Sequence, residues 1–159
     1  MLNALDLAGL RLIRGRAQSA ALTRWVARFS SLGEHARLWL ALGAVGATLD
    51  RGRREAWIAA TRRVALAYAV NTAVKLVVRR RRPQLEGLPQ LTGTPTQLSF
   101  PSAHATTSFA AARQYARLGL PSTALNAVAA GLAWSRVYLG VHYPSDVVAG
   151  ALLGRWLGR

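Results

Sequence analysis

The 159-residue sequence contains no cysteine, a single lysine and only six acidic residues. Without cysteine, the chain cannot form disulfides, use a thiol nucleophile or bind a metal through sulfur. So few carboxylates leave no cluster of oxygen ligands to hold magnesium. The one lysine, Lys75, stands among 21 basic residues, so it is an ammonium group retained against a strong arginine bias.

Long uncharged runs are also scarce. Only residues 118–135 reach the roughly 18 residues that usually indicate a membrane-spanning helix. Hydrophobic residues nevertheless make up 52% of the chain, and its formal net charge is +15. A soluble nucleic-acid binder would explain this charge but not the apolar content, whereas a membrane protein with arginines at its helix ends explains both. No signal peptide is expected, because Asp6 interrupts the first apolar stretch and the arginines follow it.

Helical periodicity predicts an all-α chain that forms one domain over residues 1–159. Residues 1–31 are expected to form an amphipathic interfacial segment, with helices at 2–14 and 17–31 and Trp25 as an aromatic anchor. Apolar helices are expected at 35–50, 54–79, 103–117, 121–138 and 145–157. The prediction is an integral-membrane bundle of about five to six core helices, plus the N-terminal interfacial helix.

The order of these helices predicts where the polar segments meet. The one long connection, residues 83–101, is rich in Pro, Gly and Thr, which is typical of a functional loop in so short a chain. If the five apolar helices cross a membrane in alternation, this loop falls on one face together with segments 75–82, 101–104, 135–136 and 142–146. This count of membrane crossings therefore predicts one polar site at that face.

The side chains gathered at this face suit an oxyanion. They are Lys75, Arg82, Ser102, His104, Arg136, His142 and Asp146. Three cations and a hydroxyl can bind a phosphate, and the start of a helix at Ala103 offers free N–H groups. Two histidines can supply a nucleophile and a proton donor, while a carboxylate orients one imidazole. The set predicts phosphoryl transfer with no metal and no cofactor.

Each feature also has a structural interpretation. The run Arg79–Arg82 is also typical of a lipid-contacting cluster. His104 could cap a helix, and His142 could lie at a membrane interface. Asp146 could simply stabilise the first turn of a helix. His35 has no such companions and is expected to be structural, so the joint spacing of the other residues carries the prediction.

Three segments together resemble the signature motifs of the type 2 phosphatidic acid phosphatase (PAP2) superfamily. They are KLVVRRRRP at 75–83, PSAH at 101–104 and SRVYLGVHYPSD at 135–146, in the family's order. The resemblance spans the catalytic region 75–146. Ala103 stands where the family usually has glycine, which keeps the N–H group but narrows the backbone freedom.

The resemblance implies a role for each motif residue. His142 would be the nucleophile that forms a phosphohistidine, Asp146 would orient it, and His104 would be the general acid. The phosphate would be held by Lys75, Arg82, Ser102, Ala103 and Arg136. The residues next to the first motif and in the following loop are expected to read the head group, namely Arg79, Arg80, Arg81 and Gln97.

A narrower resemblance covers residues 31–40 (SLGEHARLWL), 93–108 and 140–150. These segments look like the small actinobacterial members of the superfamily assigned as decaprenylphosphoryl-5-phosphoribose phosphatases, which act in cell-wall biosynthesis. The resemblance implies a multi-pass protein of the plasma membrane that hydrolyses a phosphomonoester on a polyprenyl-linked substrate. The product would be decaprenylphosphoryl-ribose.

Other functions stay open at this point. Related enzymes use the same motifs on polyprenyl pyrophosphate, phosphatidylglycerol phosphate or phosphatidic acid. A haloperoxidase would need bound vanadate, and a basic nucleic-acid-binding protein would show steeply salt-dependent DNA binding. The expected partners are a lipid phosphate and membrane lipids, with no nucleic acid, and assembly into a homo-oligomer is left open.

Overall fold

Seven α-helices and two short 3-10 turns account for most of the computed structural model, which describes residues 2–15 and 19–159. The α-helices are α1 (Leu2–Arg14), α2 (Ala20–Ser31), α3 (Arg37–Leu49), α4 (Arg54–Val78), α5 (Ala103–Ala116), α6 (Ser122–Tyr138) and α7 (Pro144–Leu157). The turns are η1 (Glu34–Ala36) and η2 (Arg51–Arg53). The all-α prediction is confirmed.

The predicted helix boundaries agree with the structure to within two residues, with one exception. The helix expected at 17–31 begins at Ala20, because the Ser19 hydroxyl accepts a hydrogen bond from Leu22 N at 3.1 Å and so caps the helix. Residues 17 and 18 of that prediction lie outside the described residues.

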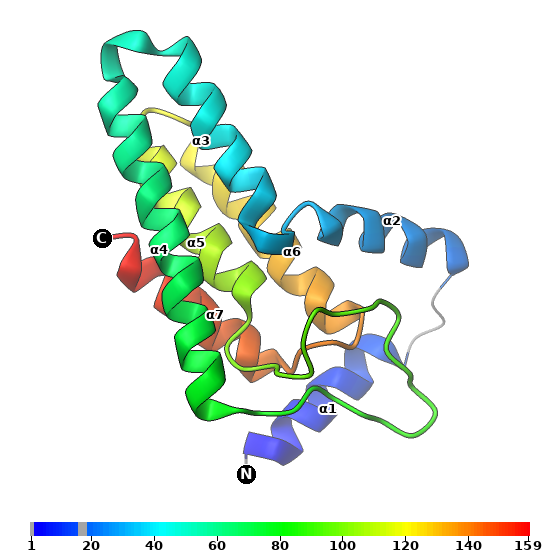
Figure 1. Cartoon of the computed structure of the whole chain (residues 1–159). Helices are drawn as coiled ribbons and strands as arrows, with labels where there is room; N and C mark the ends of the chain where they lie inside the picture. Colours follow the sequence, from blue (N-terminus) through cyan, green and yellow to red (C-terminus); the bar gives the residue numbers. More distant parts are fainter. Residues whose placement is uncertain (1, 16–18) are drawn as a thin grey trace.

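Helix α5 is the centre of the bundle (Figure 1), where it packs against α4, α6 and α7. Its sequence is rich in alanine, and Ala105, Ala110 and Ala111 are completely buried. These small side chains let the neighbouring helices approach closely. Larger side chains such as Trp39 of α3 and Leu132 of α6 fill the remaining core.

Glycines on α7 bring that helix into backbone contact with α5. A Cβ added at Gly150 would lie 2.6 Å from the carbonyl oxygen of Ser102, and one at Gly158, the residue that caps the end of α7, would lie 3.0 Å from that of Ala110. This close approach places the first turns of both helices side by side. Ser102 N donates to the main-chain oxygen of Asp146 at 3.0 Å, so two of the motifs are joined directly.

The two N-terminal helices lie at the periphery. Helix α1 packs on α6 and α7, and α2 contacts α6 while it projects from the bundle (Figure 1). Both expose apolar side chains, since Leu5, Leu12 and Trp25 are each 68% exposed. Within the described ranges, none of the helices is at once long enough and apolar enough to cross a membrane.

Candidate active site

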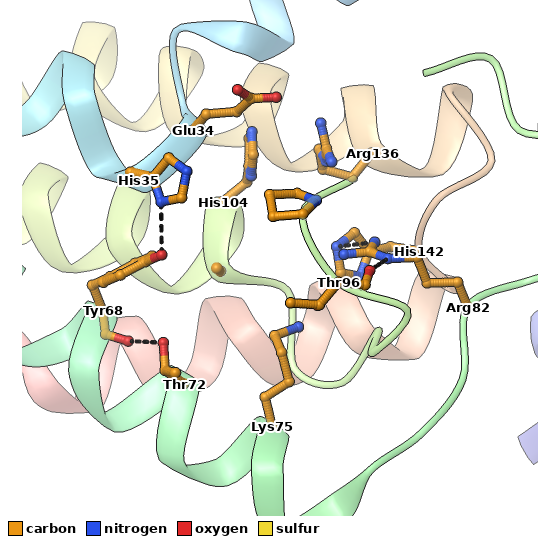
Figure 2. A pocket seen from close by; sticks show the side chains of 12 residues that line it. Glu34, His35, Tyr68, Thr72, Lys75, Arg82, Thr96, His104, Arg136 and His142 are labelled. Atoms are coloured by element: carbon orange, nitrogen blue, oxygen red, sulfur yellow. Dashed lines mark hydrogen bonds between the residues drawn. The ribbon is translucent and has the colours of Figure 1, made fainter. Parts of the chain in front are cut away.

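The polar segments meet in one pocket of about 120 Å³ (Figure 2). Its lining residues are Glu34, His35, Tyr68, Thr72, Lys75, Arg82, Pro95, Thr96, Ala103, His104, Arg136 and His142. Five of the residues proposed for catalysis or phosphate binding therefore line it together with Ala103, while Ser102 and Asp146 are fully buried. These side chains come from the ends of α4 and α6, from the chain that follows each of them, and from the starts of α5 and α7, as the helix order predicts.

The three cations are held by neutral oxygen atoms. Lys75, in the last turn of α4, donates from Nζ to Leu98 O at 3.2 Å and to Pro101 O at 3.1 Å. Arg82 donates to Thr96 O and Val141 O at 2.7 and 2.6 Å. These carbonyl groups fix the positions of the side chains but do not cancel their charge, so the pocket favours an anion.

Arg136 is the third cation and comes from the last turn of α6. Its NH1 group donates to Ser30 Oγ at 2.7 Å, whereas its buried Nε has no hydrogen-bond partner among the described residues. Ser102 Oγ is likewise buried and unpaired. A buried donor without a partner is costly, so both atoms are candidates to donate to a phosphate oxygen.

The Ser102 amide is not available to a ligand. Its N–H group already donates to Asp146 O, so the hydroxyl, rather than the backbone, is what Ser102 can offer to phosphate. Ala103 is the first residue of α5 and lines the pocket, where its N–H group lacks an intrahelical acceptor. The expected helix N-terminus is therefore present at Ala103, one residue beyond Ser102.

His142 lies in the short connection between α6 and α7. Arg82 NH1 is 3.1 Å from its Nε2. A guanidinium can only donate, so Nε2 accepts and the imidazole proton is on Nδ1. That Nδ1 atom is 3.5 Å from Asp146 Oδ2. Burial, followed by the charges of Arg82, Arg136 and Lys75, lowers the pKa of His142 well below its usual 6.5, which favours the neutral ring.

His104 faces the same pocket from the first turn of α5. Its Nε2 donates to the carbonyl oxygen of Ser30 at 2.9 Å, which fixes the plane of the ring. The ring packs against Gly33, where an added Cβ would lie 2.6 Å from His104 Cδ2. The end of α2 thus positions this imidazole, a contact that nothing in the sequence indicated.

The expected head-group residues are not brought to the pocket. Arg79 and Arg81 are exposed, and Arg80 turns away to contact Asp6 and Asp146. Gln97 lines a separate hollow formed with residues 83–90. These four residues lie outside the pocket because α4 ends at Val78, and the chain after it no longer follows the helix face that carries Lys75.

The opposite wall of the pocket was missed in the sequence. In Figure 2, His35, Tyr68 and Thr72 lie on one side and Arg82 and His142 on the other, with His104 between. His35 Nδ1 and Tyr68 Oη are 2.9 Å apart. His35, expected to be structural, reaches the pocket because it and Ala36 adopt positive φ angles of 51° and 58°.

Such a turn at two non-glycine residues has no clear sequence signal.

Within the described ranges, no group of three or more His, Asp or Glu side chains is placed to hold a metal ion.

Comparison with known proteins gives one consistent result. The PAP2 superfamily model matches residues 57–159. The chain is 46% identical over 122 residues to decaprenylphosphoryl-5-phosphoribose phosphatase of Mycolicibacterium smegmatis. The aligned region covers 76% of this chain and 67% of that protein.

Two crystal structures share the fold, each with a TM-score of 0.76. Aquifex aeolicus LpxE is 26% identical, and the match covers 97% of this chain and 92% of the LpxE chain. The transmembrane PAP2-type phosphatidylglycerolphosphate phosphatase of Bacillus subtilis is 21% identical, and the match covers 98% of this chain and 82% of that protein's chain. The similarity extends well beyond the three motifs.

Proposed function

Because the chain belongs to the PAP2 superfamily, we propose that it is a membrane lipid phosphatase that converts decaprenylphosphoryl-5-phosphoribose to decaprenylphosphoryl-ribose. The observation that carries the chemistry is the buried His142, whose Nε2 accepts a hydrogen bond from Arg82 in a pocket that Lys75 and Arg136 also line. The 46% identity to a phosphatase of that name supports the substrate.

The first half-reaction forms a phosphohistidine. The phosphate of the bound substrate accepts the hydrogen bond that Arg82 now donates to His142, which frees the Nε2 lone pair. Nε2 attacks phosphorus, and the bond from phosphorus to the sugar oxygen breaks. His104 acts as an imidazolium that the bound phosphate dianion stabilises: with Nε2–H held by Ser30 O, it gives its Nδ1 proton to that oxygen and becomes neutral. The three cations stabilise the charge on the phosphoryl oxygens.

The second half-reaction restores the enzyme. A water molecule attacks the phosphohistidine, and its proton passes to His104. The P–N bond breaks, inorganic phosphate leaves, and Nε2 regains its lone pair. Asp146 stabilises the imidazole through Nδ1 in both steps, because the ring is positively charged while Nε2 is bonded to phosphorus.

The wall opposite the cations supports a sugar head group. Glu34, His35, Tyr68 and Thr72 present a carboxylate, an imidazole and two hydroxyls within the same pocket. Ribose carries hydroxyl groups that can both donate to and accept from such side chains, whereas the diacylglycerol part of phosphatidic acid offers only ester oxygens. These four residues take the head-group role that the sequence assigned to Arg79–Arg81 and Gln97.

The proposed location is the plasma membrane. Leu5, Leu12 and Trp25 on α1 and α2 present apolar surface to the outside, and Trp25 lies under Arg28 with the guanidinium 5.9 Å from its ring. An aromatic residue beside a cation is typical of helices at the lipid interface. A polyprenyl substrate would be delivered from the same bilayer.

The test is phosphate release in detergent from a panel of lipids at equal surface concentration. The panel contains decaprenylphosphoryl-5-phosphoribose, polyprenyl pyrophosphate, phosphatidylglycerol phosphate and phosphatidic acid. We expect the phosphoribosyl lipid to be hydrolysed fastest, without loss of activity in EDTA. Faster hydrolysis of phosphatidic acid would refute the substrate, and activity that EDTA abolishes and magnesium restores would refute the mechanism.

A further inference from the structure

Helix α1 carries a buried carboxylate that belongs to none of the three motifs. Asp6 is only 3% exposed, although it lies on an amphipathic helix at the edge of the bundle. A buried carboxylate needs hydrogen-bonding or charged partners. The partners of Asp6 lead directly to the proposed catalytic residues.

Asp6 contacts the first turn of α7. Its Oδ1 accepts a hydrogen bond from Ser145 N at 2.9 Å, and its Oδ2 accepts one from Ser145 Oγ at 2.6 Å. The same Oδ2 is 2.7 Å from Arg80 NH2. Asp6 therefore holds the residue that immediately precedes Asp146.

Arg80 joins the two carboxylates. While NH2 contacts Asp6, NH1 donates to Asp146 Oδ1 at 2.8 Å. The guanidinium also lies over the ring of Tyr143, 4.0 Å from its centre, which fixes its plane. Oδ1 is held in this way, and Oδ2 accepts a hydrogen bond from Tyr143 N at 2.9 Å. Together these contacts fix the carboxylate of Asp146 with Oδ2 toward His142.

The approach of α1 is secured at a second point. Arg14, eight residues after Asp6, donates to Leu88 O and Pro89 O at 2.7 and 2.6 Å. Between the two, an added Cβ on Gly9 would lie 3.0 Å from Pro144 Cγ, so the helix rests closely against the start of α7. The position of Asp6 is thus set by the whole helix.

We propose that Asp6 and Arg80 are positioning residues that act on His142 through Asp146. The inference rests on the proposed function, in which Asp146 supports the positive charge of the phosphorylated imidazole. Arg80 alone would neutralise Asp146. With Asp6 as a second carboxylate on the same guanidinium, the group Asp6–Arg80–Asp146 keeps one net negative charge beside His142.

The kinetic test compares Asp6→Asn and Arg80→Lys with wild type on the most rapidly hydrolysed lipid of the panel. Both residues lie behind Asp146 and outside the pocket, so kcat should fall while KM stays nearly constant. We expect a loss of about 10-fold, below the ~10²-fold that a 1 Å misplacement can cost. Glu55→Gln, an exposed carboxylate in the first turn of α4, is the matched control and should keep wild-type kcat.

A double-mutant cycle separates positioning from general stability. In an Asp146→Asn background, Asp6→Asn should have little further effect, because its route to His142 is already interrupted. An equal loss in both backgrounds would overturn the inference, as would wild-type kcat for both single variants. Active wild-type protein with unaffected variants would overturn only this inference, whereas inactive wild-type protein would overturn the proposed function.

A readout without turnover comes from NMR of protein labelled with ¹⁵N-histidine. The Nδ1 signal of His142, assigned by its loss in His142→Ala, should shift in Asp6→Asn and stay in place in Glu55→Gln. Arg80→Lys should shift it as well, since an ammonium group cannot bridge both carboxylates with one planar fork. An unchanged signal in both variants would show that no coupling to His142 exists.

Discussion

We propose that the position of Lys75 explains why a chain so rich in arginine keeps one lysine. Its ammonium group is buried and bound to Leu98 O and Pro101 O, beneath the pocket that Arg82 and His142 line from the side. An ammonium has three donors on one atom, so two can hold the carbonyls while the third is left for a phosphate in the pocket that Lys75 lines. A planar guanidinium is wider and cannot replace this compact charge.

The exchange Lys75→Arg tests this explanation, because it preserves charge. Removing one preorganised contact at a transition state typically costs about 10²–10³-fold in kcat, and we expect the lower end of that range. The measurement is kcat and KM beside Arg155→Lys, an exposed exchange on α7. Near-wild-type turnover of Lys75→Arg would mean that the lysine has no chemical role.

The proposed role of His104 as the general acid can be tested by itself. If it protonates the leaving oxygen, His104→Ala should slow hydrolysis of lipid substrates by about 10²–10⁴-fold, since an alkoxide is a poor leaving group. An activated aryl phosphate needs no such proton and should be hydrolysed with a smaller loss. Steady-state rates on both substrates decide the matter, and equal losses would contradict the assigned role.

At the scale of elements, the contact between α5 and α7 builds the site. Gly150 and Gly154 let α7 pack on the backbone of α5, which brings His142 and Asp146 next to Ser102 and His104. The sequence shows the spacing of these glycines, but it does not show that α5 is the helix against which they pack. A periodic small-residue face shows that a helix packs closely, but not against which neighbour.

Gly154→Ala is expected to destabilise the fold. Its Cβ would overlap the carbonyl group of Thr106, and backbone cannot move aside as a flexible side chain can. Overpacking of this kind typically costs about 1–3 kcal/mol. Thermal unfolding in detergent should show a lower Tm than for Gly52→Ala, where an added Cβ has nothing within 4 Å. Equal Tm values would refute the proposed contact.

For the whole molecule, the helices and the convergence of the motifs could be predicted, because both follow from periodicity and chain order. The pocket wall formed by His35, Tyr68 and Thr72 could not be predicted, since it depends on the backbone turn at His35. The contact between Asp6 and Arg80 joins residues 74 positions apart. Within a run of four arginines, the sequence predicted that Arg82 reaches the site, but it did not indicate that Arg80 faces a carboxylate.

The account depends most on His142 as the nucleophile. The direct measurement is to quench the protein with alkali during turnover of the phosphoribosyl lipid and locate phosphate on peptides by mass spectrometry. We predict an alkali-stable, acid-labile phosphohistidine at His142, and neither phosphoenzyme nor phosphate release in His142→Ala. Phosphate on another residue, or turnover that survives in His142→Ala, would contradict the proposed mechanism.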